Sequence, residues 1–178
     1  MSEFLQQLIN GLSVGSIYAL IALGYTMVYG VLRFINFAHG DVFMVGAFAG
    51  LYFHRWLNPW LARLPELVSA LIILCIAMVV CGALGIIIEK LAYKPLRDRP
   101  RLTVLITAIG VSLLLEYLGQ LVFGATPRRF PPLIANKLVG GLGDLTVSSK
   151  QLIVLGVTVA ILIGLRFIVL KTRMGLAM

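Results

Sequence analysis

The feature that most constrains the fold is a series of apolar stretches, each long enough to cross a lipid bilayer. No charged residue occurs from Phe4 to Leu32, and about 20 apolar residues in a helix are enough to span the hydrocarbon core. Three more stretches, 67–88, 103–123 and 152–170, are long and mainly apolar; the second contains Glu116 and the third Arg166. A soluble core of 178 residues could not bury so much apolar surface, whereas lipid can cover it. We therefore expect an all-α membrane protein.

The charge distribution agrees with a membrane protein. Only 12% of the residues are charged, about half the share in a soluble domain. The net charge of +8 would also suit a nucleic-acid-binding protein. The Lys and Arg residues, however, lie almost entirely between the apolar stretches and form no basic face. We expect lipid around the chain and no nucleic-acid partner.

A further stretch, 34–53, is irregular. Polar residues interrupt its first part, and the uniformly apolar part, 42–53, is too short to span a bilayer as a straight helix. Either the polar part enters the membrane with it, or the helix is broken; a backbone break at that depth must be covered by protein or line a cavity. The sequence thus predicts about five transmembrane helices, the second of which is the candidate for a broken or re-entrant one.

Positive charge predicts the orientation. Segment 89–101 is the richest short connector in basic residues, with Lys90, Lys94, Arg97, Arg99 and Arg101. Cytoplasmic loops carry the excess of Lys and Arg. We therefore expect this segment in the cytoplasm and the N-terminus on the outer side of the membrane. The segments 54–66 and 124–150 are expected to be connectors on the outer side of the membrane.

Small and polar residues in the second stretch align if a helix runs from Asn36 to Gly50. One stripe then holds Asn36, His39, Phe43, Gly46 and Gly50. Two interpretations stay open. Asn36 and His39 line a translocation path, or the stripe is a packing seam in which Gly46 and Gly50 admit a neighbouring helix closely. The packing interpretation is the more common use of such residues.

His39 and Asp41 raise the possibility of a proton relay or a metal site. A metal site needs three or four ligands, and no other histidine is near in sequence except His54. We expect no metal and no cofactor. An interfacial turn, with Arg33 and Asp41 in headgroup water, is the plainer interpretation.

Glu116 is a second ionisable residue inside an apolar stretch. In a helix it shares an i, i+4 stripe with Ala108, Ser112 and Gln120. A carboxylate near mid-membrane costs about 2.5–3.5 kcal/mol, so it should face protein or water. Ser112 and Glu116 could therefore line a path that attracts an ammonium group, or be hydrogen-bonded at a helix interface.

The first stretch contains Gly11, Gly15 and Ala19 at four-residue spacing, a pattern that indicates helix packing. No phosphate loop and no catalytic motif occur in the chain. An intramembrane enzyme using His39, Asp41 or Glu116 is disfavoured, because these residues lie on different segments with no nucleophile beside them. We expect a protein that is not an enzyme.

Four segments resemble a known family. GLSVGSIYALIALGYTMVYGVLRFINFAHGD (11–41) closely resembles the N-terminal signature of permease subunits from branched-chain amino-acid ABC importers. EKLAYKPLR (89–97), which contains Glu89, Lys94 and Arg97, looks like the family's cytoplasmic loop. ITAIGVSLLLE (106–116) is similar to its next span, and TRMGLAM (172–178) to the segment leading toward the ATPase-contacting loop. The resemblance implies that 1–178 is one transmembrane permease domain.

The resemblance also implies partners. They are a second permease subunit, cytoplasmic ABC ATPases that drive alternating access, and a periplasmic binding protein that delivers leucine, isoleucine or valine. Two residues depart from the family pattern, since Glu116 stands where an amide is usual and Leu176 where a basic residue is usual. Family members continue further, so the chain looks like an N-terminal portion. A permease for urea or short amides, or a truncated non-transporting scaffold, are the alternatives.

Overall fold

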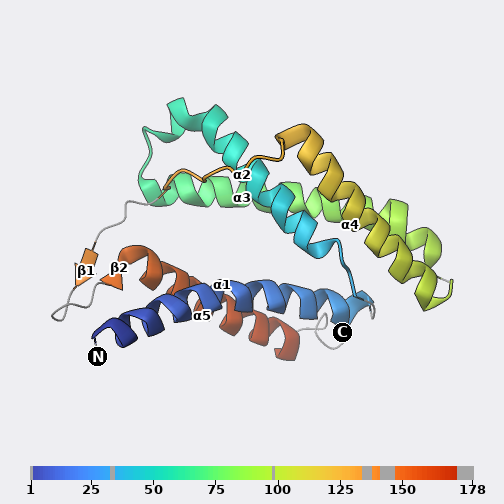
Figure 1. The fold of residues 1–178 in the computed structure, drawn as a ribbon, viewed down its shortest axis with the longest axis horizontal. Helices are drawn as coiled ribbons and strands as arrows, with labels where there is room; N and C mark the ends of the chain where they lie inside the picture. The colour runs from blue at the N-terminus through green and yellow to red at the C-terminus, as the bar shows by residue number, and fades with distance from the viewer. Residues whose placement is uncertain (1, 33–34, 98, 134–137, 141–146, 172–178) are drawn as a thin grey trace. The chain divides into compact units, whose positions relative to one another are not determined.

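The computed structural model describes residues 2–32, 35–97, 99–133, 138–140 and 147–171. Its main elements are five long helices (Figure 1): α1 (Ser2–Leu32), α2 (His39–Leu61), α3 (Glu66–Ile88), α4 (Arg101–Phe123) and α5 (Ser149–Lys171). The expected all-α membrane architecture with about five helices is confirmed. Two short antiparallel strands, β1 (Leu138–Gly140) and β2 (Val147–Ser148), were not expected.

Four helical segments have the length and apolar composition to cross a membrane. They are Glu3–Gly30, Glu66–Leu96, Leu102–Phe123 and Ser149–Lys171. The chain is therefore a multi-pass membrane protein. Helix α2 has 23 residues but carries too many polar side chains to stand among these four. The helix is continuous from His39, and the backbone at 35–38, just before it, is not helical. Whether the polar part enters the membrane stays a prediction.

The exposed surfaces of the helices are apolar, as in a protein surrounded by lipid. Large apolar side chains remain exposed along every helix; Leu121, for example, is 82% exposed. Among the described residues, no large side chain is fully buried. In water this exposure would cost roughly 25 cal/mol for each Å² of apolar surface, and in a bilayer that cost disappears.

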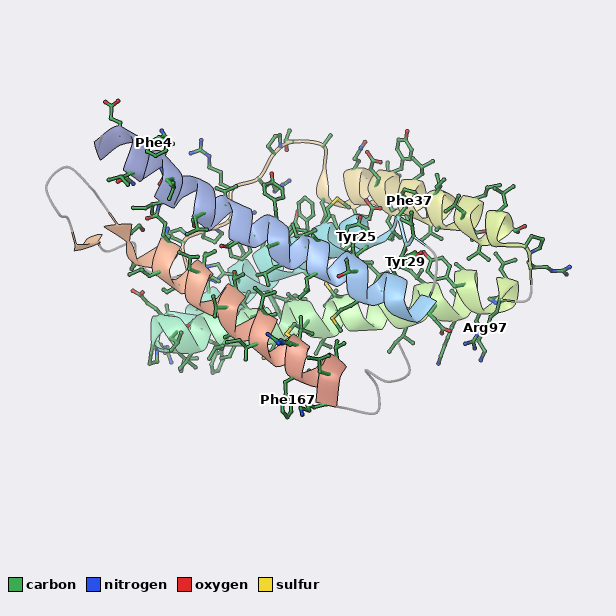
Figure 2. All side chains as sticks on the ribbon, turned by 90° about the horizontal axis from the view of Figure 1, so that it is seen from below. Phe4, Tyr25, Tyr29, Phe37, Arg97 and Phe167 are labelled. Carbon is green, nitrogen blue, oxygen red and sulfur yellow. The ribbon has the colours of Figure 1, made fainter. Side chains whose placement is uncertain are left out.

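The chain divides into two compact units. Unit 1 contains α1, the two strands and α5, and unit 2 is 34–134, with α2, α3 and α4. In unit 1, α1 packs against α5, and the Gln151 amide Nε2 donates a 2.8 Å hydrogen bond to Oδ1 of Asn10. Figure 2 shows Phe4 and Phe167 near opposite ends of this unit. The single domain expected for the whole chain stays a prediction.

In unit 2, helix α2 packs on α3 and α4 (Figure 1). The expected connector 54–66 is wrong in its first part, because α2 continues through Pro59 to Leu61. Pro59 lacks a backbone N–H and so removes one i→i−4 hydrogen bond, and the helix ends two residues after it. The hydroxyl of buried Ser69 then donates a 3.0 Å hydrogen bond to the carbonyl of Leu61, which closes the turn between α2 and α3.

The expected loop 89–101 is also mostly helical. Helix α3 continues as a π-helical turn, η1 (Glu89–Tyr93), and a 3-10 turn, η2 (Lys94–Leu96). Pro95 and Pro100 are the breakers here, since neither can continue an α-helix from the preceding turn. The first part of the basic segment therefore extends α3 as far as Leu96, and Arg97 lies just beyond it (Figure 2).

Candidate functional site: a polar junction at the start of α2

The start of α2 is held by a turn built on Asn36. Oδ1 of Asn36 accepts a 3.1 Å hydrogen bond from the backbone N–H of Ala38, and its carbonyl accepts one of 3.2 Å from the N–H of His39. Asparagine favours such turns because its side chain bonds to the backbone two residues on. Ala38 is fully buried beneath the turn. Asn36 therefore lies before the helix and not on the stripe predicted for it.

A second hydrogen bond connects this turn to the extension of α3. The hydroxyl of Tyr93 donates to Oδ1 of Asn36 at 2.6 Å, and Tyr93 is buried. Buried tyrosines normally find a hydrogen-bond partner for the hydroxyl. The sequence interpretation missed Tyr93, because the π-helical turn shifts the side-chain register after Ile88 and no periodic pattern records that shift.

Asp41 and Ser112 join α2 to α4. The Ser112 hydroxyl donates a short hydrogen bond to Oδ2 of Asp41, and both residues are half-buried. Asp41 also lies in the first turn of α2, where the helix dipole favours a negative charge. The two residues were placed separately by sequence, Ser112 on a path and Asp41 in headgroup water; the structure pairs them.

Glu116 is not part of this junction. A step of four residues turns an α-helix by about 400°, so a strict i, i+4 stripe drifts by about 40° at each step. Ala108 is fully buried, Ser112 half-buried, and Glu116 exposed. Within the part of the chain that the structure describes, Glu116 makes no hydrogen bond or ion pair. Of the four residues predicted for the path, Asn36, His39 and Ser112 lie at the start of α2 or face it.

The four glycines predicted for helix packing differ in their surroundings. Gly46 and Gly50 are buried. A methyl group on Gly46 would overlap Sγ of Cys81 on α3, and one on Gly50 would lie 3.5 Å from Cγ2 of Ile73. Gly11 and Gly15 are exposed, and a methyl group on either would meet nothing within 4 Å. Their packing role stays a prediction.

Two side-chain hydrogen bonds form the junction in the described part of the chain, from Tyr93 to Asn36 and from Ser112 to Asp41. Glu89 and Lys94 are exposed on the extension of α3, next to Tyr93. These two hydrogen bonds connect the start of α2 to the extension of α3 and to α4.

Comparison with known proteins identifies the family of the chain. A family model described as "Branched-chain amino acid transport system / permease component" matches residues 7–178. The permease protein BraD of the high-affinity branched-chain amino acid transport system of Pseudomonas aeruginosa is 38% identical over 98% of this chain. The corresponding LivH protein of Escherichia coli is 36% identical over 98%. A probable LivH of Methanocaldococcus jannaschii is 32% identical over 92%.

The chain spans 58% of the length of BraD and 57% of that of LivH from Escherichia coli. No solved structure matches it.

Proposed function

Because the chain belongs to the family of branched-chain amino acid transport permease components, we propose that it forms part of the translocation path of an ABC importer for branched-chain amino acids. The observation that carries the proposal is the match of the family model to residues 7–178. The four apolar helices support it, because they make the chain a membrane protein. In this role the chain is not an enzyme and contains no cofactor.

The proposed partners follow from the type of transporter. A second permease subunit completes the path, cytoplasmic ATPases supply the energy, and a periplasmic binding protein delivers the amino acid. This chain has no phosphate-binding loop, so ATP hydrolysis belongs to another chain.

The proposed orientation places 89–101 in the cytoplasm and the N-terminus in the periplasm. The bond from Tyr93 to Asn36 supports a common side for the basic extension and the start of α2. The excess of basic residues in the extension favours the cytoplasm for that side. The opposite ends of α2 and α4 then face the periplasm.

We assign the predicted path residues two roles. Asn36, His39 and Ser112 hold the cytoplasmic end of α2 beside the path, because Asn36 and Ser112 hydrogen-bond to the neighbouring helices. Glu116 is exposed on α4. A carboxylate in that position needs water or a polar partner, which a water-filled path or another subunit supplies.

Uptake measured in cells tests the proposal. The chain is expressed in its natural reading frame, together with the ATPase, the second permease and the binding protein of the same transport system. Leucine uptake that requires this chain is the expected result. Urea uptake without leucine uptake would favour the amide permease. A complex that assembles but takes up neither compound would favour a scaffold.

A further inference from the structure

A groove lies at the end of unit 2 opposite the polar junction. The last turns of α2 and the segment 124–133 enclose an open volume of about 480 Å³, and small-molecule sites typically have about 300–1,000 Å³. Seven residues line it: His54, Arg55, Asn58, Arg129, Phe130, Pro131 and Pro132. None of the residues discussed so far as path or junction residues is among them.

The groove is held open by aromatic contacts on one wall. The ring of Phe130 stacks on that of His54, with 6.5 Å between centroids. The same ring packs on Gly50, where a Cβ atom would lie 3.5 Å from Cε2 of Phe130. The guanidinium of Arg128 lies over the ring of Tyr52 at 6.0 Å, a cation–π contact. The segment is therefore anchored on α2 at several points, and the groove does not depend on a single side chain.

The lining combines two kinds of side chain. Arg55 and Arg129 carry guanidinium groups and Asn58 an amide, whereas Phe130 and the two prolines are apolar. Among the described residues, no acidic side chain lines the groove. Guanidinium groups match a carboxylate geometrically and bind it through charge-assisted hydrogen bonds. An anion that carries a short apolar body would match both kinds of side chain.

We propose that this groove binds a carboxylate attached to a short branched apolar chain. The inference deepens the proposed function, and rests on it only for the identity of the natural ligand: in an importer of branched-chain amino acids, the ligand is the amino acid on its way to the path, held by its carboxylate. In the proposed orientation the groove faces the periplasm, from which the amino acid arrives.

The lining also predicts what the groove does not recognise. An ammonium group finds no acidic partner among the lining residues, so it must stay in water at the open mouth. 4-Methylpentanoate, which is leucine without its amino group, should therefore bind at least as tightly as leucine. Isoamylamine, which keeps the ammonium and lacks the carboxylate, should not bind.

Tryptophan fluorescence can report on this groove. The chain has two tryptophans, Trp56 and Trp60, on the same turns of α2 as Arg55 and Asn58, and they are 78% and 72% exposed. The purified chain in an uncharged maltoside detergent is titrated at pH 7 with 4-methylpentanoate, leucine and isoamylamine, at constant ionic strength set with sodium chloride. We expect a saturable change with the first two compounds only.

Variants identify the site. Arg55→Gln and Arg129→Gln should each weaken binding roughly tenfold or more, since a hydrogen bond between charged groups is lost. Arg63→Gln is the matched control, because Arg63 is an exposed arginine nearby that does not line the groove; it should change the affinity less than about twofold. Circular dichroism and the Tm establish that the variants fold. Arg55→Lys keeps the charge and should bind with intermediate affinity.

Three results would overturn the groove proposal. They are a fluorescence response to 4-methylpentanoate that does not saturate, a response to added chloride as large as that to 4-methylpentanoate, and a loss of affinity in Arg63→Gln as large as in Arg55→Gln and Arg129→Gln. Because the titration uses this chain alone, its outcome is separate from that of the uptake experiment. Saturable binding without uptake by the assembled transporter would contradict the transport proposal only. Uptake of leucine without saturable binding would contradict the groove only.

Discussion

The hydroxyl of Tyr93 lies 2.6 Å from Oδ1 of Asn36 and donates a hydrogen bond to it, across 57 positions of sequence. The same oxygen accepts the N–H of Ala38, so one amide oxygen both shapes the start of α2 and attaches it to the extension of α3. The basic end of α3 and the start of α2 should therefore move together.

Removal of the Tyr93 hydroxyl tests this attachment. Tyr93→Phe keeps the buried ring and deletes one hydrogen bond, while Asn36 keeps its bond to Ala38. The expected loss of stability is about 1 kcal/mol, measured by thermal or urea unfolding in detergent. Tyr29→Phe, at an exposed position on α1, should change the stability by less than about 0.5 kcal/mol. Equal effects of the two variants would show that the bond contributes nothing.

The pair of Asp41 and Ser112 predicts an energetic coupling between α2 and α4. Asp41→Ala and Ser112→Ala should each destabilise the protein by about 1–3 kcal/mol, because each leaves a half-buried polar partner unsatisfied. The double variant should lose less than the sum, and this double-mutant cycle isolates the interaction.

Glu116→Ala is the control for that cycle. Glu116 lies one turn beyond Ser112 and makes no hydrogen bond within the described residues, so its removal should change the stability of the isolated chain by less than about 0.5 kcal/mol. Strictly additive effects of the Asp41 and Ser112 variants would be evidence against a bond between them.

These residues also show how far sequence reasoning reaches. Spans such as 67–88 and 103–123 were predictable, since length and apolar character alone decide whether a helix can cross a membrane. The close approach at Gly46 had a visible signal in the GxxxG pattern. The bond from Tyr93 to Asn36 had no such signal. It depends on the π-helical turn at Glu89–Tyr93 and on the turn at Asn36, after which α2 begins at His39, three residues later than the predicted stripe.

The position of Glu116 outside the junction also has no signal in the sequence, and its path role stays a prediction. The i, i+4 rule finds neighbours over one turn, but over two turns the stripe rotates away from the packing face. The face of α4 that is buried runs from Val104 and Ala108 to Gly119, a mixture of three- and four-residue steps. A sequence alone does not say which of the two neighbouring stripes meets α2.

The glycines of α1 and α2 should respond differently to the same substitution. Gly46→Ala places a methyl group against Sγ of Cys81, and overpacking of this kind costs about 1–3 kcal/mol. Gly11→Ala meets nothing within 4 Å and should be neutral or stabilising by up to about 1 kcal/mol, because alanine is the better helix former. Unfolding of the isolated chain measures both.

A second substitution tests the cause assigned to Gly46. Cys81→Ala removes the sulfur atom, so Gly46→Ala should cost much less in that background. A cost that is unchanged by Cys81→Ala would place the clash elsewhere. If Gly11→Ala were as harmful as Gly46→Ala, the open face described for α1 would be wrong for the protein in detergent.

The orientation can be read from single cysteines. In a background with Cys75 and Cys81 replaced by alanine, Arg63→Cys lies between α2 and α3, and Lys94→Cys lies on the basic extension; both positions are exposed. A membrane-impermeant maleimide added to intact cells should label position 63 and leave position 94 unlabelled until the membrane is permeabilised, because the excess of Lys and Arg keeps the extension inside. Neutral residues in place of the basic ones in 89–101 should reduce this difference. Labelling of position 94 in intact cells, with position 63 protected, would reverse the proposed topology and place the carboxylate groove on the cytoplasmic side.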